Sequence, residues 1–267
     1  MPRSDELQAA RALLRWYAES GVDEAVLTEP ASFFERAAAP PAARPALIRS
    51  DNASVTPIAP AFAVSVDEAA AEARRLASLC LTVEDLARAV AAFDGCPLKS
   101  GAKTTVFADG VHGAPLLVIG EAPGKEEDQQ GKPFVGRAGQ LLDRMLAAIG
   151  RSRTRDTLIS NVVYWRPPGN RTPTQAEIAV CKPFVERLIA LTRPKAVMLA
   201  GGAAAQALLN VSGIMRVRGV WREIELGSGE RVLAMPILHP AYLLRQPAQK
   251  RLAWRDLQSL AARLTTD

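Results

Sequence analysis

Apolar positions from residue 116 onward follow two spacings in turn, and this alternation predicts strands and helices. Short, nearly continuous apolar runs predict buried strands at 116–119, 157–163 and 196–200. Apolar residues that recur every three or four positions predict helices at 138–149, 174–191, 202–210 and 248–264. Strands that alternate with helices are typical of a parallel sheet that is covered on both faces.

A probable hairpin lies between the last two helices, with strands at 217–226 and 231–238. Its second strand completes a central, mainly parallel sheet of four strands. We therefore expect residues 93–267 to form a three-layer α/β/α domain.

Residues 1–92 differ from this pattern and are expected to form a helical N-terminal extension. Residues 5–19 have an amphipathic spacing, and Ser4 is a candidate N-cap. Residues 37–64 are rich in Ala and Pro and predict a linker, and two further helices are predicted at 66–79 and 83–93.

Composition excludes several classes of protein. No apolar run approaches the ~18 to 20 residues of a membrane span, and the N-terminus lacks the order of a secretory signal. Three cysteines, Cys80, Cys96 and Cys181, are too few for a disulfide framework. We therefore expect a cytoplasmic protein.

The formal net charge of +5 is unevenly distributed. Residues 1–90 contain 9 Lys/Arg and 13 Asp/Glu, a net of −4, whereas residues 91–267 contain 24 and 15, a net of +9. A basic surface suits a polyphosphate partner. Ordinary Arg-rich solubility would leave the same charge, so both interpretations remain open at this point.

The loop after the first predicted strand is the strongest sign of a ligand site. Residues 116–139, LLVIGEAPGKEEDQQGKPFVGRAG, read as strand, glycine-rich loop and helix start. Such loops lie at the carboxyl end of a parallel strand, where α/β proteins bind ligands. Phe134 stands between Gly131, Pro133 and Gly136, and a flat side chain on a stiff loop suits stacking on something planar. The acidic run 126–128 is interpreted as a solvated face.

Polar residues follow two other predicted strands. Asn161 follows the second strand, and His239 follows the last. If the strands are parallel, these loops meet at one edge and bring Glu121, Phe134, Asn161 and His239 around one crevice. An aromatic ring, an amide, a carboxylate and an imidazole together suit a planar heterocycle with amide edges.

Four segments resemble the uracil-DNA glycosylase superfamily, and most of all its family 4, the bacterial and archaeal iron–sulfur type. They are GEAPG (120–124), GKPFVGRAGQLLD (131–143), NVVYWRPPGNRTP (161–173) and HPAYLLR (239–245). The resemblance extends from about Phe93 to Leu264. It implies a monofunctional enzyme that flips uracil out of DNA and hydrolyses its N-glycosidic bond, leaving an abasic site. It also implies a cytoplasmic, nucleoid-associated bacterial protein, a probable monomer that acts on single- or double-stranded DNA.

The resemblance assigns roles to individual residues. Glu121 takes the place of the carboxylate near the sugar and a water molecule. Phe134 matches the aromatic residue that stacks on the flipped uracil, with Gly120 beside it. Asn161 matches the asparagine that reads the polar edge of uracil, and His239 matches the histidine that donates to O2 as negative charge develops.

Further residues are assigned to DNA contacts. Leu243 matches the apolar wedge that fills the space left in the duplex. Arg166, Asn170, Arg171 and Arg245 are candidates for contacts with the DNA backbone.

The family's iron–sulfur cluster is not expected here. Family 4 generally holds a four-iron cluster with four cysteines, and this chain has cysteine at two of those positions, Cys96 and Cys181. Phe93 and Trp165 stand at the other two. Such clusters need a complete set of thiolates, so we expect no metal and no cofactor, with the two aromatic residues filling the volume.

Two alternatives remain open. One is a binder of damaged or abasic DNA with weak or no turnover, since Ala122 stands where the defining family has an aspartate. The other is a nucleotide-binding α/β enzyme acting on free small molecules, although the chain lacks a GxGxxG or GK[ST] phosphate motif.

Overall fold

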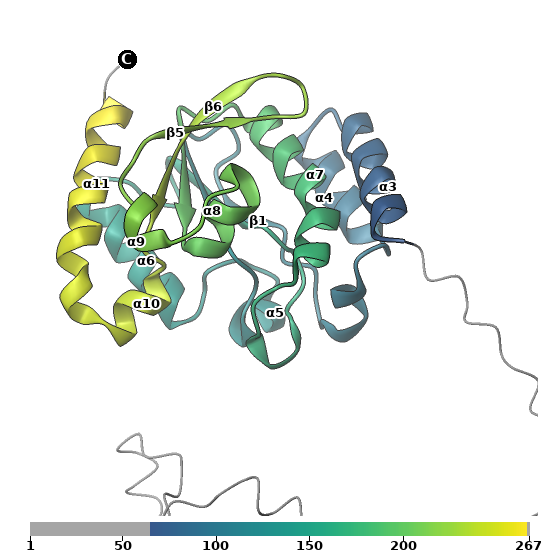
Figure 1. Ribbon diagram of the computed structural model, residues 1–267, viewed down its shortest axis with the longest axis horizontal. Coiled ribbons are helices and arrows are strands. Elements are labelled where there is room, and N and C mark those ends of the chain that lie inside the picture. Colours follow the sequence, from purple (N-terminus) through teal and green to yellow (C-terminus); the bar gives the residue numbers. More distant parts are fainter. Residues whose placement is uncertain (1–64, 266–267) are drawn as a thin grey trace, which may run out of the picture. The chain divides into compact units, whose positions relative to one another are not determined.

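The computed structural model describes residues 65–265 (Figure 1). The helix predicted at 5–19 with Ser4 as its cap, and the linker predicted at 37–64, lie outside the described residues.

One mixed sheet of six strands forms the centre of the described part of the chain, in the order β1-β3-β2-β4-β6-β5. Its inner strands run parallel: β3 (Thr157–Asn161), β2 (Leu116–Gly120), β4 (Ala196–Ala200) and β6 (Arg231–Ile237). Short antiparallel strands lie at both edges, β1 (Ala108–Gly110) beside β3 and β5 (Arg222–Glu225) beside β6.

The predicted α/β fold is confirmed, but the predicted number of four strands is wrong. The four parallel strands are those that the apolar runs and the hairpin predicted. The β1 edge strand was missed because its three residues, Ala-Asp-Gly, carry no apolar pattern. The hairpin strand predicted at 217–226 shortens to β5, because residues 214–217 form the short helix α9 (Ile214–Val217) instead.

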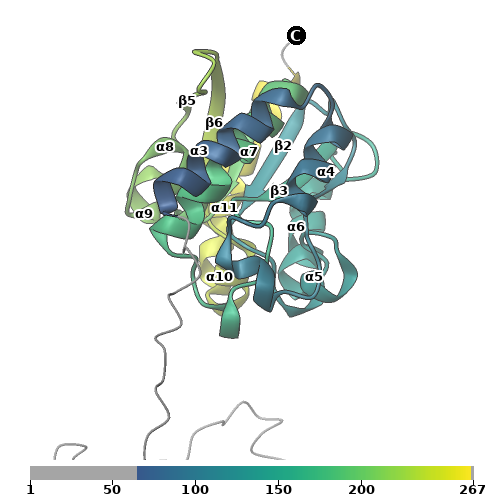
Figure 2. The ribbon, with the colours of Figure 1, turned by 90° about the vertical axis from the view of Figure 1, so that its right-hand side faces the viewer.

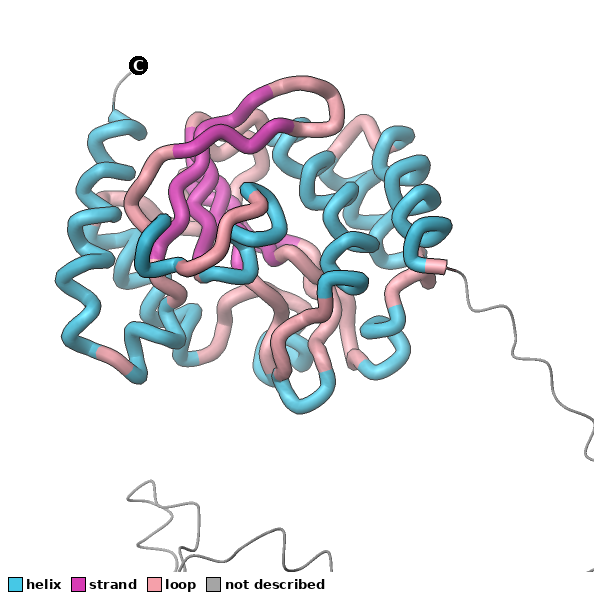
Figure 3. Tube along the Cα trace, in the orientation of Figure 1, coloured by secondary structure: helices cyan, strands magenta, loops and turns pink. Residues whose placement is uncertain are grey.

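The inner strands are buried on both faces, and alternate side chains enter two different cores. Leu117 and Ile119 of β2 belong to a core shared with α4 (Val83–Ala92), α7 (Gln175–Thr192) and α8 (Gly202–Leu209). Leu116 and Val118 belong to the opposite core, with α6 (Arg137–Ala148) and α11 (Lys250–Thr265). Figures 1 and 3 show the resulting layers, with α11 on one side of the strands and α7 on the other.

An additional helix, α3 (Val66–Leu79), packs along α7 (Figure 2). Its contact face consists of Ala69, Ala73 and Ala77, which are spaced by four residues and are all buried. Small side chains at this spacing allow two helices to approach closely. At its end, the guanidinium of Arg187 on α7 donates to the backbone carbonyl of Cys80. The helices predicted at 66–79 and 83–93 therefore share a hydrophobic core with the sheet.

Helix boundaries agree with the predictions to within a few residues, and three short helices, α9 among them, were not indicated by the apolar pattern. Helix α5 (Lys125–Gln130) is polar throughout, and α10 (Pro240–Arg245) begins at a proline directly after His239. The remaining elements are single 3-10 turns: η1 (Pro97–Gly101), η2 (Pro168–Asn170) and η3 (Pro247–Gln249). Among the described helices, none has the length and apolar character needed to cross a membrane.

Candidate active site

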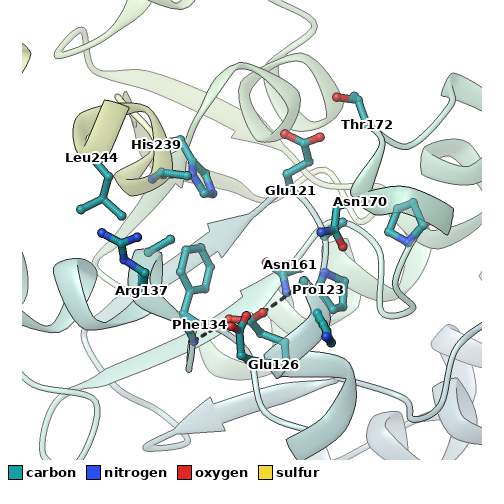
Figure 4. A pocket seen from close by; sticks show the side chains of 18 of the residues that line it. Glu121, Pro123, Glu126, Phe134, Arg137, Asn161, Asn170, Thr172, His239 and Leu244 are labelled. Carbon is teal, nitrogen blue, oxygen red and sulfur yellow. Dashed lines mark hydrogen bonds between the residues drawn. The ribbon is translucent and has the colours of Figure 1, made fainter. Parts of the chain in front are cut away.

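A cavity of about 750 Å³ opens at the carboxyl edge of the parallel strands (Figure 4). Parallel pairing places Gly120, the last residue of β2, directly opposite Asn161, the last residue of β3. His239 lies two residues beyond the end of β6, which is separated from β2 by β4 alone. The structure thus brings Glu121, Phe134, Asn161 and His239 to the wall of one cavity. A volume of this size is typical of small-molecule sites, which run from roughly 300 to 1,000 Å³.

Phe134 forms one wall of the cavity in a conformation that non-glycine residues rarely adopt. Its φ angle is 54°, in the left-handed region, and its ring is buried to 6% exposure. Such a conformation costs on the order of 1 kcal/mol and persists only where the surroundings enforce it. Gly139 of α6 is one part of those surroundings, since a Cβ atom there would lie 1.8 Å from the carbonyl oxygen of Phe134.

Glu127 holds the loop on the other side of Phe134. Its buried carboxylate accepts hydrogen bonds from the backbone N–H groups of Val135 and Gly136, both at 2.9 Å, and from that of Gly124 at 3.1 Å. One carboxylate therefore connects the loop after β2 to the start of α6. Asp128 beside it accepts from the backbone of Lys103 and Thr104.

The interpretation of residues 126–128 as a solvated face is wrong for two of its three residues. Glu127 and Asp128 are buried, with exposures of 9% and 7%. Charged side chains are almost never buried without partners, and here backbone N–H groups supply them. An acidic run in a turn-rich loop looks the same in sequence whether water or the loop's own backbone solvates it.

Asn161 lies at the bottom of the cavity with an amide that no protein group satisfies. Its exposure is 1%, and its Nδ2 forms no hydrogen bond with any residue that the structure describes. An unpaired buried amide costs about 1 to 3 kcal/mol, which indicates a bound partner in the functional state. Gly120 leaves the space for that partner, since a Cβ atom there would lie 2.4 Å from Asn161 Oδ1 and 2.5 Å from the Phe134 ring.

His239 is held as a neutral hydrogen-bond donor. Its Nδ1 accepts from the backbone N–H of Ala241 at 3.1 Å, so the ring caps α10 and carries its proton on Nε2. Loss of hydration lowers the pKa of His239 to about 4, with a further lowering from the positive charge of Arg245 and a partial compensation from Glu127. The centroid of its ring lies 5.7 Å from that of the Phe134 ring, and the two ring planes form an angle of 30°.

Glu121 lines the cavity on the side opposite Phe134. Figure 4 shows its carboxylate directed toward the loop that carries Thr172. Within the described part of the chain no hydrogen bond to this carboxylate is seen, so it is available to a ligand or to water.

The rim of the cavity requires a correction to the predicted wedge. Leu243 is 1% exposed and packs in the core beneath α10, so its side chain cannot leave without opening that core. Leu244 is the leucine at the rim, where it is 37% exposed. Arg245 lines the cavity beside it, and Arg137 at the start of α6 is a rim cation that was not among the residues predicted from the sequence.

The loop 166–173 forms the opposite rim, and its side chains are partly committed to each other. Arg166 donates through Nε to Asn170 Oδ1 at 2.7 Å and does not line the cavity. Arg171 lines it, but its guanidinium forms two hydrogen bonds with the buried carboxylate of Glu177. Arg171 therefore fixes the loop and has fewer donors left for a ligand. Asn170 lies at the cavity wall, and its amide nitrogen donates to none of the residues that the structure describes.

The sequence contained a sign of the positions of two rim residues, Leu244 and Arg137. His239-Pro240 is a helix start, with a capping side chain followed by proline at the first helical position. A helix over 240–245 separates the directions of Leu243 and Leu244, which an extended segment does not. Arg137 follows a glycine at the start of a predicted helix, where side chains point toward the carboxyl edge of the sheet.

The four positions at which a cluster would be held do not fit one. Cys96 and Cys181 are buried, and the thiol of Cys181 shares a hydrogen bond with Cys96; this bond, with burial, raises the pKa of Cys181 well above its usual range. Phe93 packs edge-on against Phe184 with ring centroids 5.2 Å apart. Trp165 is 1% exposed and donates from Nε1 to Thr105 Oγ1 at 3.0 Å. Two buried cysteines and two large rings occupy the volume in place of four thiolates.

Elsewhere in the described residues, no group of three or more His, Cys, Asp or Glu side chains is arranged to hold a metal ion. The cavity itself offers an aromatic wall, an amide that both donates and accepts, and a neutral imidazole N–H. These groups suit a flat polar ring that enters edge-first.

Known proteins share this arrangement of segments. Residues 107–258 match the family model of the uracil DNA glycosylase superfamily. The chain is 37% identical over 171 residues to the type-4 uracil-DNA glycosylase of Archaeoglobus fulgidus, which covers 62% of this chain and 85% of that protein. It is 37% identical over 167 residues to the type-4 enzyme of Thermotoga maritima, covering 61% and 84%. It is also 30% identical over 151 residues to a DNA polymerase of Bacillus phage SP01, covering 57% of this chain and 16% of that protein.

The family model spans 152 of the 267 residues and includes every residue that lines the cavity. The resemblance drawn from the four segments is thereby confirmed, and the chain belongs to the uracil-DNA glycosylase superfamily.

Proposed function

We propose that this protein excises uracil from DNA in the cavity between Phe134, Asn161 and His239, as a monofunctional glycosylase of DNA repair. The observation that carries the proposal is the unsatisfied amide of Asn161, buried at the bottom of a slot that Gly120 keeps open. The relatives named as type-4 uracil-DNA glycosylases support the same activity.

Asn161 selects uracil by its hydrogen-bonding edge. Its Oδ1 accepts from uracil N3–H, and its Nδ2 donates to O4. Cytosine presents the opposite pattern to this amide, a bare N3 and an amino group. Leaving both partners unpaired at such depth is the means by which a site of this kind rejects the wrong base. Phe134 supplies the flat surface on which the base stacks.

His239 stabilises the departing base. Cleavage of the N-glycosidic bond leaves an oxocarbenium-like sugar and a uracil anion, whose charge lies partly on O2. The Nε2–H of His239 is oriented by the bond between Nδ1 and Ala241, so the donor is in place before charge develops. A fixed donor of this type is worth about 3 to 4 kcal/mol of transition-state stabilisation.

Glu121 is the group assigned to the sugar and the water. Its carboxylate carries negative charge at the cavity wall opposite Phe134. We infer that it stabilises the positive sugar and orients the water that attacks it, since Ala122 offers no second carboxylate.

Uracil reaches this cavity by leaving the base stack, at a cost of a few kcal/mol. Leu244, exposed at the rim, is the wedge that fills the vacated space in place of the buried Leu243. Arg137 and Arg245 on this side, and Asn170 opposite, are placed to contact phosphates. We propose that the enzyme acts as a monomer on single- and double-stranded DNA in the bacterial cytoplasm and releases an abasic product.

We also propose that the enzyme works without an iron–sulfur cluster. The support is the packing of Phe93 and Trp165 and the protonated Cys181 at the cluster positions. In the type-4 relatives a cluster joins these segments; here we infer that apolar packing of the two aromatic rings connects them.

Removing the side-chain amide of Asn161 tests the proposal directly. Asn161→Ala should lower the single-turnover rate of uracil release by about 30- to 1,000-fold, the equivalent of ~2 to 4 kcal/mol. The measurement is strand cleavage by alkali after incubation with a uracil-containing oligonucleotide. Asn210→Gly, at the end of α8 and outside the cavity, is the matched control. Tight binding of abasic DNA by the unaltered protein without uracil release would instead favour the DNA-binding alternative.

The rate of excision should not depend on protonation of His239 near neutral pH. The pKa of about 4 lies below the usual 6.5, so the ring is almost entirely neutral between pH 7.5 and 5.5. The single-turnover rate should therefore show no step as pH falls from 7.5 to 5.5. The only other histidine, His112, is exposed and paired with Glu84, and His112→Asn is the control. A step centred near pH 6.5 that survives in His112→Asn would contradict a neutral His239.

The two leucines of α10 should have separable effects. Leu244→Ala should slow excision from a duplex by roughly tenfold and affect single-stranded substrate less, because only the duplex has a stack to hold open. Leu243→Ala should instead lower the free energy of unfolding by about 2 to 5 kcal/mol. Duplex and single-strand rates, with urea unfolding of both variants, measure the difference. A larger duplex defect in folded Leu243→Ala than in Leu244→Ala would restore the first assignment.

Iron analysis tests the absence of the cluster. Protein purified without exposure to oxygen should be colourless and contain no stoichiometric iron while releasing uracil at its full rate. About four iron atoms per chain, lost together with activity on chelation, would overturn the proposal.

A further inference from the structure

We propose that Arg153, which lies outside the cavity, is the positioning residue for Phe134 and thereby sets the surface on which the base stacks. The inference rests on the proposed role of Phe134 in base binding. It concerns a residue of the loop before β3, which lies between the second and third of the four segments that carry the family resemblance and belongs to neither.

Arg153 binds the backbone of Phe134 directly. Its Nη2 donates to the carbonyl oxygen of Phe134 at 2.7 Å, and its Nη1 donates to the carbonyl oxygen of Pro133 at 3.0 Å. A guanidinium is a planar fork whose donors have fixed directions. Two successive carbonyl groups bound to one fork therefore have a defined orientation relative to it.

The guanidinium is itself held on two other sides. Nη1 also donates to Asp109 Oδ2 at 3.1 Å, and Nε donates to Asp143 Oδ1 at 2.9 Å. Asp109 belongs to the edge strand β1, and Asp143 belongs to α6. The side chain of Arg153 is only 15% exposed. Four of its five N–H donors are thus committed within the protein, which leaves little capacity for a phosphate.

The conformation of Phe134 makes this clamp necessary. A phenylalanine at φ 54° gains nothing from its own backbone preference, and an unrestrained loop would return to the ordinary region. Glu127 holds the two N–H groups that follow Phe134, and Arg153 holds the carbonyl groups of Phe134 and of the residue before it. The peptide is thereby fixed from opposite sides, by a buried anion and a partly buried cation.

The clamp also fixes Phe134 relative to the residue that reads the base. Asp109 of β1 pairs in register with Ile159 of β3, the strand that ends at Asn161. The Phe134 ring and the Asn161 amide are therefore both positioned by the same pair of strands, β1 and β3. This gives the short β1 strand a function, since it carries one of the two carboxylates that orient the clamp.

A double-mutant cycle separates positioning from general stability. Arg153→Met should lower the single-turnover rate of uracil release by about tenfold, and Phe134→Ala by about 100-fold. In the Phe134→Ala background, Arg153→Met should change the rate less than about twofold, because there is no ring left to position. Arg153→Lys, which can reach one acceptor, should recover part of the loss. Rates are measured at a temperature where thermal unfolding shows every variant folded.

Arg155→Met is the matched control, because Arg155 is exposed and donates only to Ser152 and Gly150 of its own loop. It should keep the rate of the unaltered protein within about twofold, since surface changes of this kind have small effects. Equal losses from Arg153→Met in both backgrounds, or no loss at all, would overturn the positioning role. If Phe134→Ala and Phe134→Leu both retain full activity, the stacking role of Phe134 fails instead, which is a different result from failure of the clamp.

Discussion

Parallel pairing of β2 with β3 on one side and β4 on the other is the constraint on which the site depends. It places Gly120 opposite Asn161 and brings the loops that follow three strands to one edge. The connection that leaves β2 leads to β3 on one side, whereas the connection that leaves β4 leads to β5 and β6 on the other, so a crevice opens between them. Every group assigned to the base lies at this crevice, although they are separated by more than a hundred residues in sequence.

Within this frame, the loop between β2 and α6 is ordered by charge rather than by apolar packing. Two charged groups, the buried Glu127 carboxylate and the partly buried Arg153 guanidinium, bind the backbone on either side of Phe134. Buried ions are costly unless hydrogen bonds satisfy them, and here each has several. The result is a rigid aromatic wall in a conformation that the loop would not adopt alone. A site organised in this way is preformed, so stacking of the base need not supply the energy of ordering the loop.

At the positions that would hold an iron–sulfur cluster, side-chain packing connects segments that are distant in the sequence. Phe93 precedes the sheet, Trp165 follows β3, and Cys181 lies on α7. Metal–thiolate bonds would hold such segments with directional bonds. Phe93 against Phe184, and Trp165 hydrogen-bonded to Thr105, hold them by burial and one polar contact. The rings of Phe93 and Trp165 are buried in the core that α3 and α4 extend on the far side of α7.

Much of the fold followed from the apolar pattern. The four parallel strands, the long helices and the order of layers were all predictable. A strand that is buried on both faces has a continuous apolar run in its sequence, and a helix that is buried on one face has apolar residues every three or four positions. The β1 strand and helix α5 were not, since the first is three residues long and the second is polar throughout. Their stability comes from partners elsewhere in the chain, which no local pattern contains.

The sequence by itself determined the family, the fold class and which side chains could read a base, because these follow from residue types and their order. The tertiary structure decided which leucine reaches the rim, since a helix starting at Pro240 turns Leu243 inward and Leu244 outward. It also decided that Glu127 is buried and that Arg153 clamps Phe134. Both depend on distances between segments that become neighbours only when the sheet has formed, and the direction of a side chain is a property of that packing.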